Sequence, residues 1–192
     1  ISTDLPIKSI FSEKLILEEI KIITDINKIQ NLIEVARAYK TNPELFILNK
    51  IIKDGLISIE SKISFNEDGS IRKNYLVDGN IENLKIELFN DSLIENINFS
   101  FLIKDKKYLI YNLTSIYQSI NINSNQIKIL NNENYYLFEG EISNQKGEID
   151  LDKFSYLLNH KIGNFIKKKL TISSNNKFSF KLNKKMKLSD IN

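Results

Sequence analysis

The chain has 192 residues, of which 42% are hydrophobic and 27% are charged, and its net charge is +3. This balance excludes a disordered chain, and no apolar run approaches the roughly 18 residues of a membrane-spanning helix. The absence of cysteine excludes disulfides, thiolate metal sites and a cysteine nucleophile.

The beginning of the chain indicates two short strands followed by two helices. Alternating apolar residues predict strands over 5–11 and 14–24, although the second stretch also fits a helix. Between about 25 and 53 the apolar residues recur at helical spacing. The second of the two helices in this segment has its N-terminal signal at Pro43 and its expected stop at Asp54-Gly55.

The stretch from about 55 to 150 is typical of antiparallel strands joined by turns. Apolar and polar residues alternate, as in Ile57, Ile59 and Ile63. Because strand side chains point to alternate faces, each such strand has one apolar and one polar face. The alternation moves from odd to even positions near Glu82-Asn83, which predicts a bulge or a short turn there.

Turn residues and the same alternation predict the boundaries of the remaining strands. Turns are expected at 67–70, 90–92, 104–106 and 145–147. Strands are expected at 116–122, then separately around 127–129, at 136–142, at 165–172, at 178–182 and at 186–191, with polar joints at 173–176 and 183–185. The sequence therefore predicts one domain over 1–192, mainly β with minor α, with a long antiparallel sheet and two short helices near the N-terminus.

The C-terminal strands, about 151–192, carry most of the positive charge. This segment has ten lysines against two aspartates, a net charge of +8, so the rest of the chain carries −5. The lysines, interleaved with Phe165, Phe178 and Phe180, fit a solvated sheet edge, a contact with anionic lipid headgroups, or a nucleic-acid surface. The absence of arginine from this segment counts against nucleic acid.

We find no residue constellation that predicts catalysis. His160 is the single histidine, and without a second histidine or a cysteine it predicts neither a metal site nor a catalytic dyad. Glu139 and Glu141 share one strand face at a spacing compatible with a glycosidase carboxylate pair, but on an amphipathic strand that face is the solvated one. We therefore expect no enzyme activity, no metal and no cofactor.

The apolar strand faces have two interpretations. They form an ordinary core beneath the two helices or between two sheets, or they exceed what two short helices cover and leave an apolar trough that needs a guest.

Several phrases of the sequence resemble a known family. Leu5-Pro-Ile-Lys-Ser-Ile-Phe-Ser, Asn42-Pro-Glu-Leu-Phe and glycine-punctuated strands such as Gly79-Asn-Ile-Glu-Asn-Leu resemble the interior of AsmA-like proteins, the TamB and YhdP group of Gram-negative bacteria. The strand phrases Ile97-Asn-Phe-Ser-Phe-Leu-Ile and Phe138-Glu-Gly-Glu-Ile-Ser-Asn are similar to strands of that group. The chain begins at Ile1 without the family's anchor helix, so we expect it to be an interior fragment.

The resemblance implies a long curved β-groove that carries phospholipid between the inner and outer membranes. It also implies a periplasmic location in outer-membrane biogenesis, with a tether to the inner membrane in the full-length protein. The expected function is thus a non-catalytic segment of a lipid-transfer conduit, whose partners are phospholipid and, through other parts of the parent chain, the membrane. The alternatives are a structural β-module of an envelope protein with a closed core and, through the C-terminal lysines, a nucleic-acid binder.

The residues expected to line the groove are the apolar members of the strand patterns. They are Ile57, Ile59, Ile63, Phe65, Leu84, Ile86, Leu88, Ile97, Phe99, Phe101, Ile103, Phe138 and Ile142. Lys167, Lys168 and Lys169 are the expected contacts for an anionic headgroup.

Overall fold

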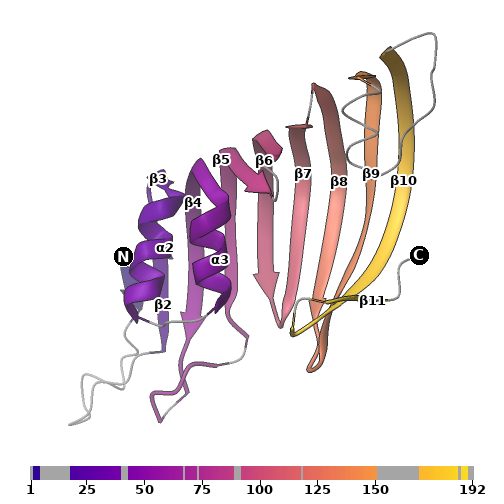
Figure 1. The fold of residues 1–192 in the computed structure, drawn as a ribbon. Helices are drawn as coiled ribbons and strands as arrows, with labels where there is room; N and C mark the ends of the chain where they lie inside the picture. The colour runs from indigo at the N-terminus through magenta and orange to yellow at the C-terminus, as the bar shows by residue number, and fades with distance from the viewer. Residues whose placement is uncertain are drawn as a thin grey trace.

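The described residues form an open, curved antiparallel sheet with two short helices at its N-terminal end (Figure 1). The computed structural model describes residues 2–4, 18–39, 43–66, 68–72, 74–88, 92–117, 119–150, 169–185 and 187–189. The expected fold class, mainly β with minor α, is confirmed.

In the part of the chain that the structure describes, the sheet has eleven strands whose spatial order almost repeats their order in the sequence. They are β1 (Ser2–Asp4), β2 (Glu19–Ile23), β3 (Asn27–Lys28), β4 (Ile52–Ser64), β5 (Leu76–Leu88), β6 (Ser92–Lys104), β7 (Lys107–Tyr117), β8 (Ile120–Asn131), β9 (Tyr135–Asp150), β10 (Lys169–Asn183) and β11 (Leu188–Ser189). Strand β2 neighbours β4 directly, and β3 pairs with β4 beside it. The helices are α2 (Ile29–Tyr39) and α3 (Pro43–Ile51).

The strand register places the apolar residues of successive strands on one face, which we call the apolar face. Ile57 pairs with Ile81, and Ile81 pairs with Phe99. Further along the strands, Ile103 pairs with Tyr108, which pairs with Ile129. Directly paired residues of antiparallel strands point to the same side, so the alternation expected from the sequence is preserved across the sheet.

The two helices cover the apolar face over β4 and β5 (Figure 1). Ile29 and Ile33 of α2 are 5% and 6% exposed and pack with the equally buried Leu84 and Ile97. Ile52, Ile57, Ile81, Ile86, Ile94, Phe99 and Leu113 pack around these four. The buried core of the described residues therefore lies between the helices and the N-terminal half of the sheet.

Three asparagines hold bulges that keep the apolar face continuous along the strands. Asn83, Asn96 and Asn112 have φ angles of 51°, 51° and 52° in β5, β6 and β7, and the register shifts beside each of them. An extra residue in a strand reverses the alternation after it. The predicted bulge at Glu82-Asn83 is therefore confirmed, and it turns Leu84 to the same face as Ile81.

Two glycines make room for aromatic rings on the apolar face. Gly79 pairs with Phe101 and Gly140 pairs with Phe178. A Cβ atom at Gly79 would lie 2.3 Å from the Ser58 carbonyl oxygen and 2.8 Å from the Phe101 ring, and one at Gly140 would lie 2.9 Å from the Phe178 ring. The rings therefore lie over the glycine backbone of the neighbouring strand.

The outer edge of β10 is paired over a short length. Among the described residues, β11 pairs with it at Lys181 and Leu182, while the other edge of β10 pairs with β9 from Lys169 to Asn183. The chain has 14274 Å² of accessible surface, against about 9,400 Å² for a compact monomer of its mass. Both observations indicate a sheet that has not closed on itself.

In the first half of the sheet, one expected boundary was wrong and one expected strand lies outside the described residues. Asp54-Gly55 does not stop a helix, because α3 ends at Ile51 and continues directly into β4. Gly55 lies at a bulge of β4 with a φ of 149°, where a Cβ atom would come within 3.0 Å of Leu84. The strand expected over 5–11 lies outside the described residues.

Three expected boundaries in the second half were wrong. Residues 116–122 do not form one strand, because a turn containing Ser119 at a φ of 67° separates β7 from β8, and β8 is continuous through 127–129. The expected turn at 145–147 is a bulge inside β9, with Lys146 at a φ of 44°. The expected joint at 173–176 lies within β10, where the register shifts between Ile172 and Ser174. The expected turn at 67–70 is confirmed for the described residues 68–70, and the one at 104–106 is confirmed at Asp105 and Lys106.

Candidate functional site

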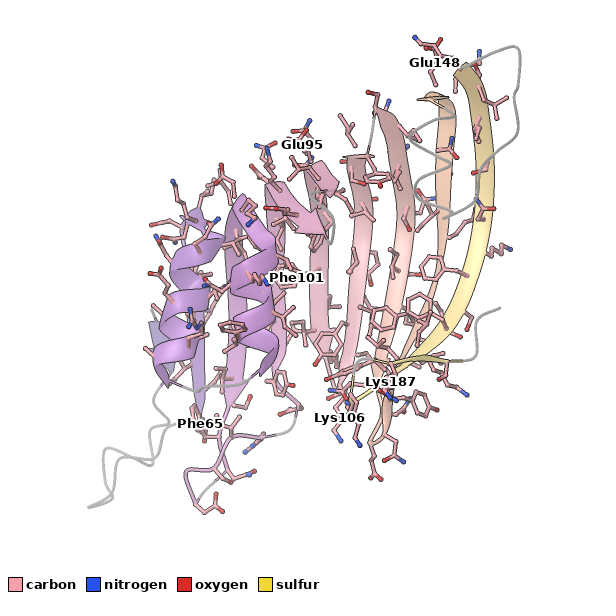
Figure 2. All side chains as sticks on the ribbon, in the orientation of Figure 1. Phe65, Glu95, Phe101, Lys106, Glu148 and Lys187 are labelled. Atoms are coloured by element: carbon pink, nitrogen blue, oxygen red, sulfur yellow. The ribbon has the colours of Figure 1, made fainter. Side chains whose placement is uncertain are left out.

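The residues predicted to line a groove share the apolar face. Ile57, Ile59 and Ile63 lie in β4, Leu84 and Ile86 in β5, Ile97, Phe99, Phe101 and Ile103 in β6, and Phe138 and Ile142 in β9. Phe65 follows β4 and bridges to Ile71 at the lower end of the sheet (Figure 2). Leu88 ends β5, and its side chain lies outside the described part of the structure.

These residues divide between two environments. Ile57, Ile86 and Phe99 pack against the helix-covered core that contains Leu84 and Ile97. Phe138 and Ile142 lie in β9, and no described helix contacts that strand. The residues predicted to line a groove therefore include members of the helix-covered core and members of a face that no described helix covers.

The part of the apolar face that neither described helix covers spans β7 to β10, and we call it the open half. Its residues are Tyr108, Ile110, Ile127, Ile129, Phe138, Ile142, Phe178, Phe180 and Leu182, all of them half-buried. Seven of the nine are absent from the residues predicted to line a groove. The signal was present, because Ile127 with Ile129 and Phe178 with Phe180 alternate in the sequence.

An aromatic cluster occupies the C-terminal side of the open half. The Phe138 and Phe180 rings stack with their centroids 4.8 Å apart at 9°, and Phe178 stacks on Phe180 at 5.8 Å. Each of these side chains remains partly exposed. This cluster of partly exposed rings is the candidate contact surface for an apolar partner.

The opposite face of the sheet is polar and carries cross-strand ion pairs. Lysine and glutamate side chains meet at 2.6–3.2 Å in Lys21–Glu60, Lys53–Glu87, Lys85–Glu95, Lys128–Glu139 and Lys169–Glu148. These side chains are at least about one third exposed, so each pair contributes at most about 1 kcal/mol to stability. The charge pattern shows which face meets water.

The glutamates considered as a catalytic pair lie on this polar face. Glu139 pairs with Lys128 at 3.2 Å. Glu141 lines a pocket of about 330 Å³ together with Ser124, Asn125, Gln126, Gly140, Ser143 and Lys177. The Ser124 hydroxyl is buried there without a hydrogen-bond partner. The pairing of Glu139 with Lys128 leaves this arrangement without two facing carboxylates.

Lys169, one of the three predicted headgroup contacts, lies at the start of β10 and pairs with Glu148 at 3.0 Å. Lys167, Lys168 and His160 lie outside the described residues. The described residues contain no group of three potential metal ligands and no helix of the length and apolarity needed to span a bilayer.

One carboxyl group in the described residues has a shifted pKa. Hydrogen bonds from the Ser70 hydroxyl, at 2.6 Å, and from the Ser70 backbone N–H, at 2.9 Å, hold the pKa of Asp68 below its usual range. These bonds stabilise the exposed turn between β4 and β5 and have no part in the open half.

The geometry thus offers one extended candidate site, the open half of the apolar face, and no assembled catalytic centre among the described residues. Comparison with protein-family models, with curated proteins and with solved structures gives no match, so function is inferred from this face.

Proposed function

We propose that the chain is a non-catalytic segment of an AsmA-like lipid-transfer conduit whose apolar face shields the acyl chains of phospholipids. The observation that carries the proposal is the open half: an apolar face that continues over four strands beyond the helices. Burial of acyl chains there is favourable by about 25 cal/mol per Å² of apolar area. Such a face needs no catalytic residue and no cofactor.

The setting of this activity is part of the same proposal. The polar face remains in water, while a lipid lies along the opposite face with its headgroup at the ends of the strands. In the full-length protein we place the segment in the periplasm, tethered to the inner membrane, so that phospholipid moves along the sheet towards the outer membrane. The resemblance of the strand phrases to AsmA-like proteins supports this setting.

The choice of variants follows from the two environments of the apolar face. Phe99 packs on the helix-covered core, so an aspartate there tests folding more than lipid binding. Phe138 and Phe180 stack on each other in the open half. Their sequence neighbours Leu137 and Ser179 lie on the polar face and supply a matched control with the same two added charges.

The test measures phospholipid that co-purifies with the protein, by solvent extraction and mass spectrometry. Wild type and the Leu137→Asp/Ser179→Asp control should carry phospholipid, whereas Phe138→Asp/Phe180→Asp should lose at least about 90% of it, because two buried charges strongly disfavour acyl chains. Circular dichroism checks that both variants keep the sheet. A folded wild type free of lipid would contradict the proposal and favour a structural β-module with a closed core.

A further inference from the structure

A group of lysines gathers at one end of the strands, beside the open half. Lys104, Lys106 and Lys107 lie at the turn between β6 and β7, and Lys184, Lys185 and Lys187 lie between β10 and β11. We call these six residues the basic rim. Antiparallel order brings the two turns to the same end of the sheet, and Figure 2 shows Lys106 and Lys187 there.

Hydrogen bonds through the turn between β8 and β9 join the two halves of the basic rim. The Asn131 N–H donates to the Lys106 carbonyl at 2.9 Å, and the Lys184 N–H donates to the Asn134 carbonyl at 3.2 Å. The Lys184 ammonium donates to the Asn131 side-chain oxygen and lies 3.6 Å from the centroid of the Tyr136 ring. The six lysines therefore stand on one connected set of turns.

The charge of the basic rim is uncompensated in the part of the chain that the structure describes. All six lysines are exposed and none forms an ion pair there. The acidic residues within these turns are Asp105 and Glu133, which leaves a net charge of +4.

The opposite end of the strands differs in charge. Lys85 pairs with Glu95 at 2.7 Å, and Lys169 pairs with Glu148 at 3.0 Å. Figure 2 shows Glu95 and Glu148 at that end, away from Lys106 and Lys187. Among the described residues, lysines therefore stand without acidic partners at the Lys106 and Lys187 end, whereas Lys85 and Lys169 at the opposite end are paired with glutamates.

The basic rim adjoins the aromatic part of the open half. Phe180 precedes Lys184 by four positions, which corresponds to about 13 Å along the strand. Between them lie Leu182 and, on the paired strand, Tyr136. Aromatic side chains with a polar end, next to lysines, are typical of the boundary between hydrocarbon and water.

We propose that the basic rim binds the phosphate of an anionic phospholipid whose acyl chains lie on the open half. The inference rests on the proposed function and adds to it a substrate class and an orientation, with the headgroup at the Lys106 and Lys187 end. Each lysine close to an anionic headgroup favours it over a zwitterionic one by about fivefold. A nucleic acid fits less well, because the Phe138 and Phe180 ring faces stack on each other.

The experiment measures which lipid the whole chain takes from mixed vesicles. The protein is incubated with vesicles of equal parts phosphatidylglycerol and phosphatidylcholine, re-isolated, and its bound lipids are quantified by mass spectrometry. The rim variant is Lys104→Gln/Lys107→Gln/Lys185→Gln/Lys187→Gln. The control variant replaces four exposed lysines elsewhere, Lys28→Gln/Lys50→Gln/Lys62→Gln/Lys177→Gln, and removes the same charge.

Wild type and control should be enriched in phosphatidylglycerol by about fivefold or more, and the rim variant should bind both lipids nearly equally with its total lipid unchanged. An excess of glycerol phosphate should leave the enrichment intact; if it abolishes the enrichment, the rim binds free phosphate and the inference fails. Equal binding of both lipids by wild type overturns the inference alone. Absence of any bound lipid, with or without retention on RNA, overturns the proposed function as well.

Discussion

Asn83, Asn96 and Asn112 each determine which face the second half of a strand presents. Their positive φ angles lie in the left-handed region, which asparagine and glycine enter more readily than other residues. At each position the strand gains one residue, and the apolar residues beyond it return to the helix side of the sheet. The backbone conformation thus accounts for the choice of asparagine over a branched residue at these positions.

Asn112 is suited to a test because its side chain is exposed. Asn112→Ile should lower the free energy of unfolding by about 1–2 kcal/mol, because a β-branched residue is strained at this φ. Asn112→Gly, measured beside it in urea, should be neutral or slightly stabilising. Equal stability of the isoleucine and glycine variants would show that the strand does not need the left-handed residue.

At the scale of elements, α2 and α3 cover the apolar face over β4 and β5, and neither of these described helices covers β7 to β10. Its residues Ile29 and Ile33 bury themselves against Leu84 and Ile97, whereas Val35 on the same helix is 68% exposed. The packing of α2 therefore belongs to the core on the N-terminal half of the sheet and is separate from the open half.

Ile33→Ala should lower the free energy of unfolding by about 2–5 kcal/mol, because it leaves a cavity in the small core. Val35→Ala, on the exposed side of α2, should change it by no more than about 0.5 kcal/mol. Denaturant unfolding measures both. The phospholipid content of the folded Ile33→Ala protein should equal that of wild type, and a parallel loss of lipid would mean that the helix takes part in lipid binding.

Alternation in the sequence predicted the strand faces, because the period of two follows directly from strand geometry. It did not predict where strands end. Ser173 to Asn176 are polar residues typical of a loop, yet they lie inside a long strand in which Ser174, Asn175 and Asn176 pair with β9. The turn between β7 and β8 was missed for the converse reason, since Gln118-Ser119 carries no glycine, proline or asparagine.

The candidate site was predicted in part for a related reason. Residues such as Phe99 and Phe138 have the same pattern in sequence, but one packs beneath α2 and the other lies beyond it. Only the placement of the helices across the sheet distinguishes core from open face. The basic rim likewise combines Lys104–Lys107 with Lys184–Lys187, which strand order brings together from positions far apart in the chain.

At the scale of the whole molecule, few of the described apolar side chains are buried and the accessible surface is large. Four apolar side chains among the described residues are buried, while the accessible surface of the chain exceeds that of a compact monomer by about half. Stability therefore comes from long runs of strand pairing more than from a deep core.

Removal of lipid should expose the open half to a hydrophobic dye. Protein stripped of lipid on a hydrophobic resin should enhance the fluorescence of an anilinonaphthalene dye several-fold, and added phospholipid should reverse the enhancement. Phe138→Asp/Phe180→Asp should bind less dye than Leu137→Asp/Ser179→Asp. If lipid-free wild type does not enhance the fluorescence of the dye, the sheet is closed on itself and the open half is not accessible.

The outer edge of β10 determines how far the apolar surface can be extended by additional strands. From Lys169 to Phe180 this edge pairs with no described strand, so another strand, from this or another polypeptide, can add to the sheet. Each added strand would extend the apolar surface by about 4.8 Å without altering its cross-section. The number of paired strands then sets the distance over which such a sheet carries a lipid.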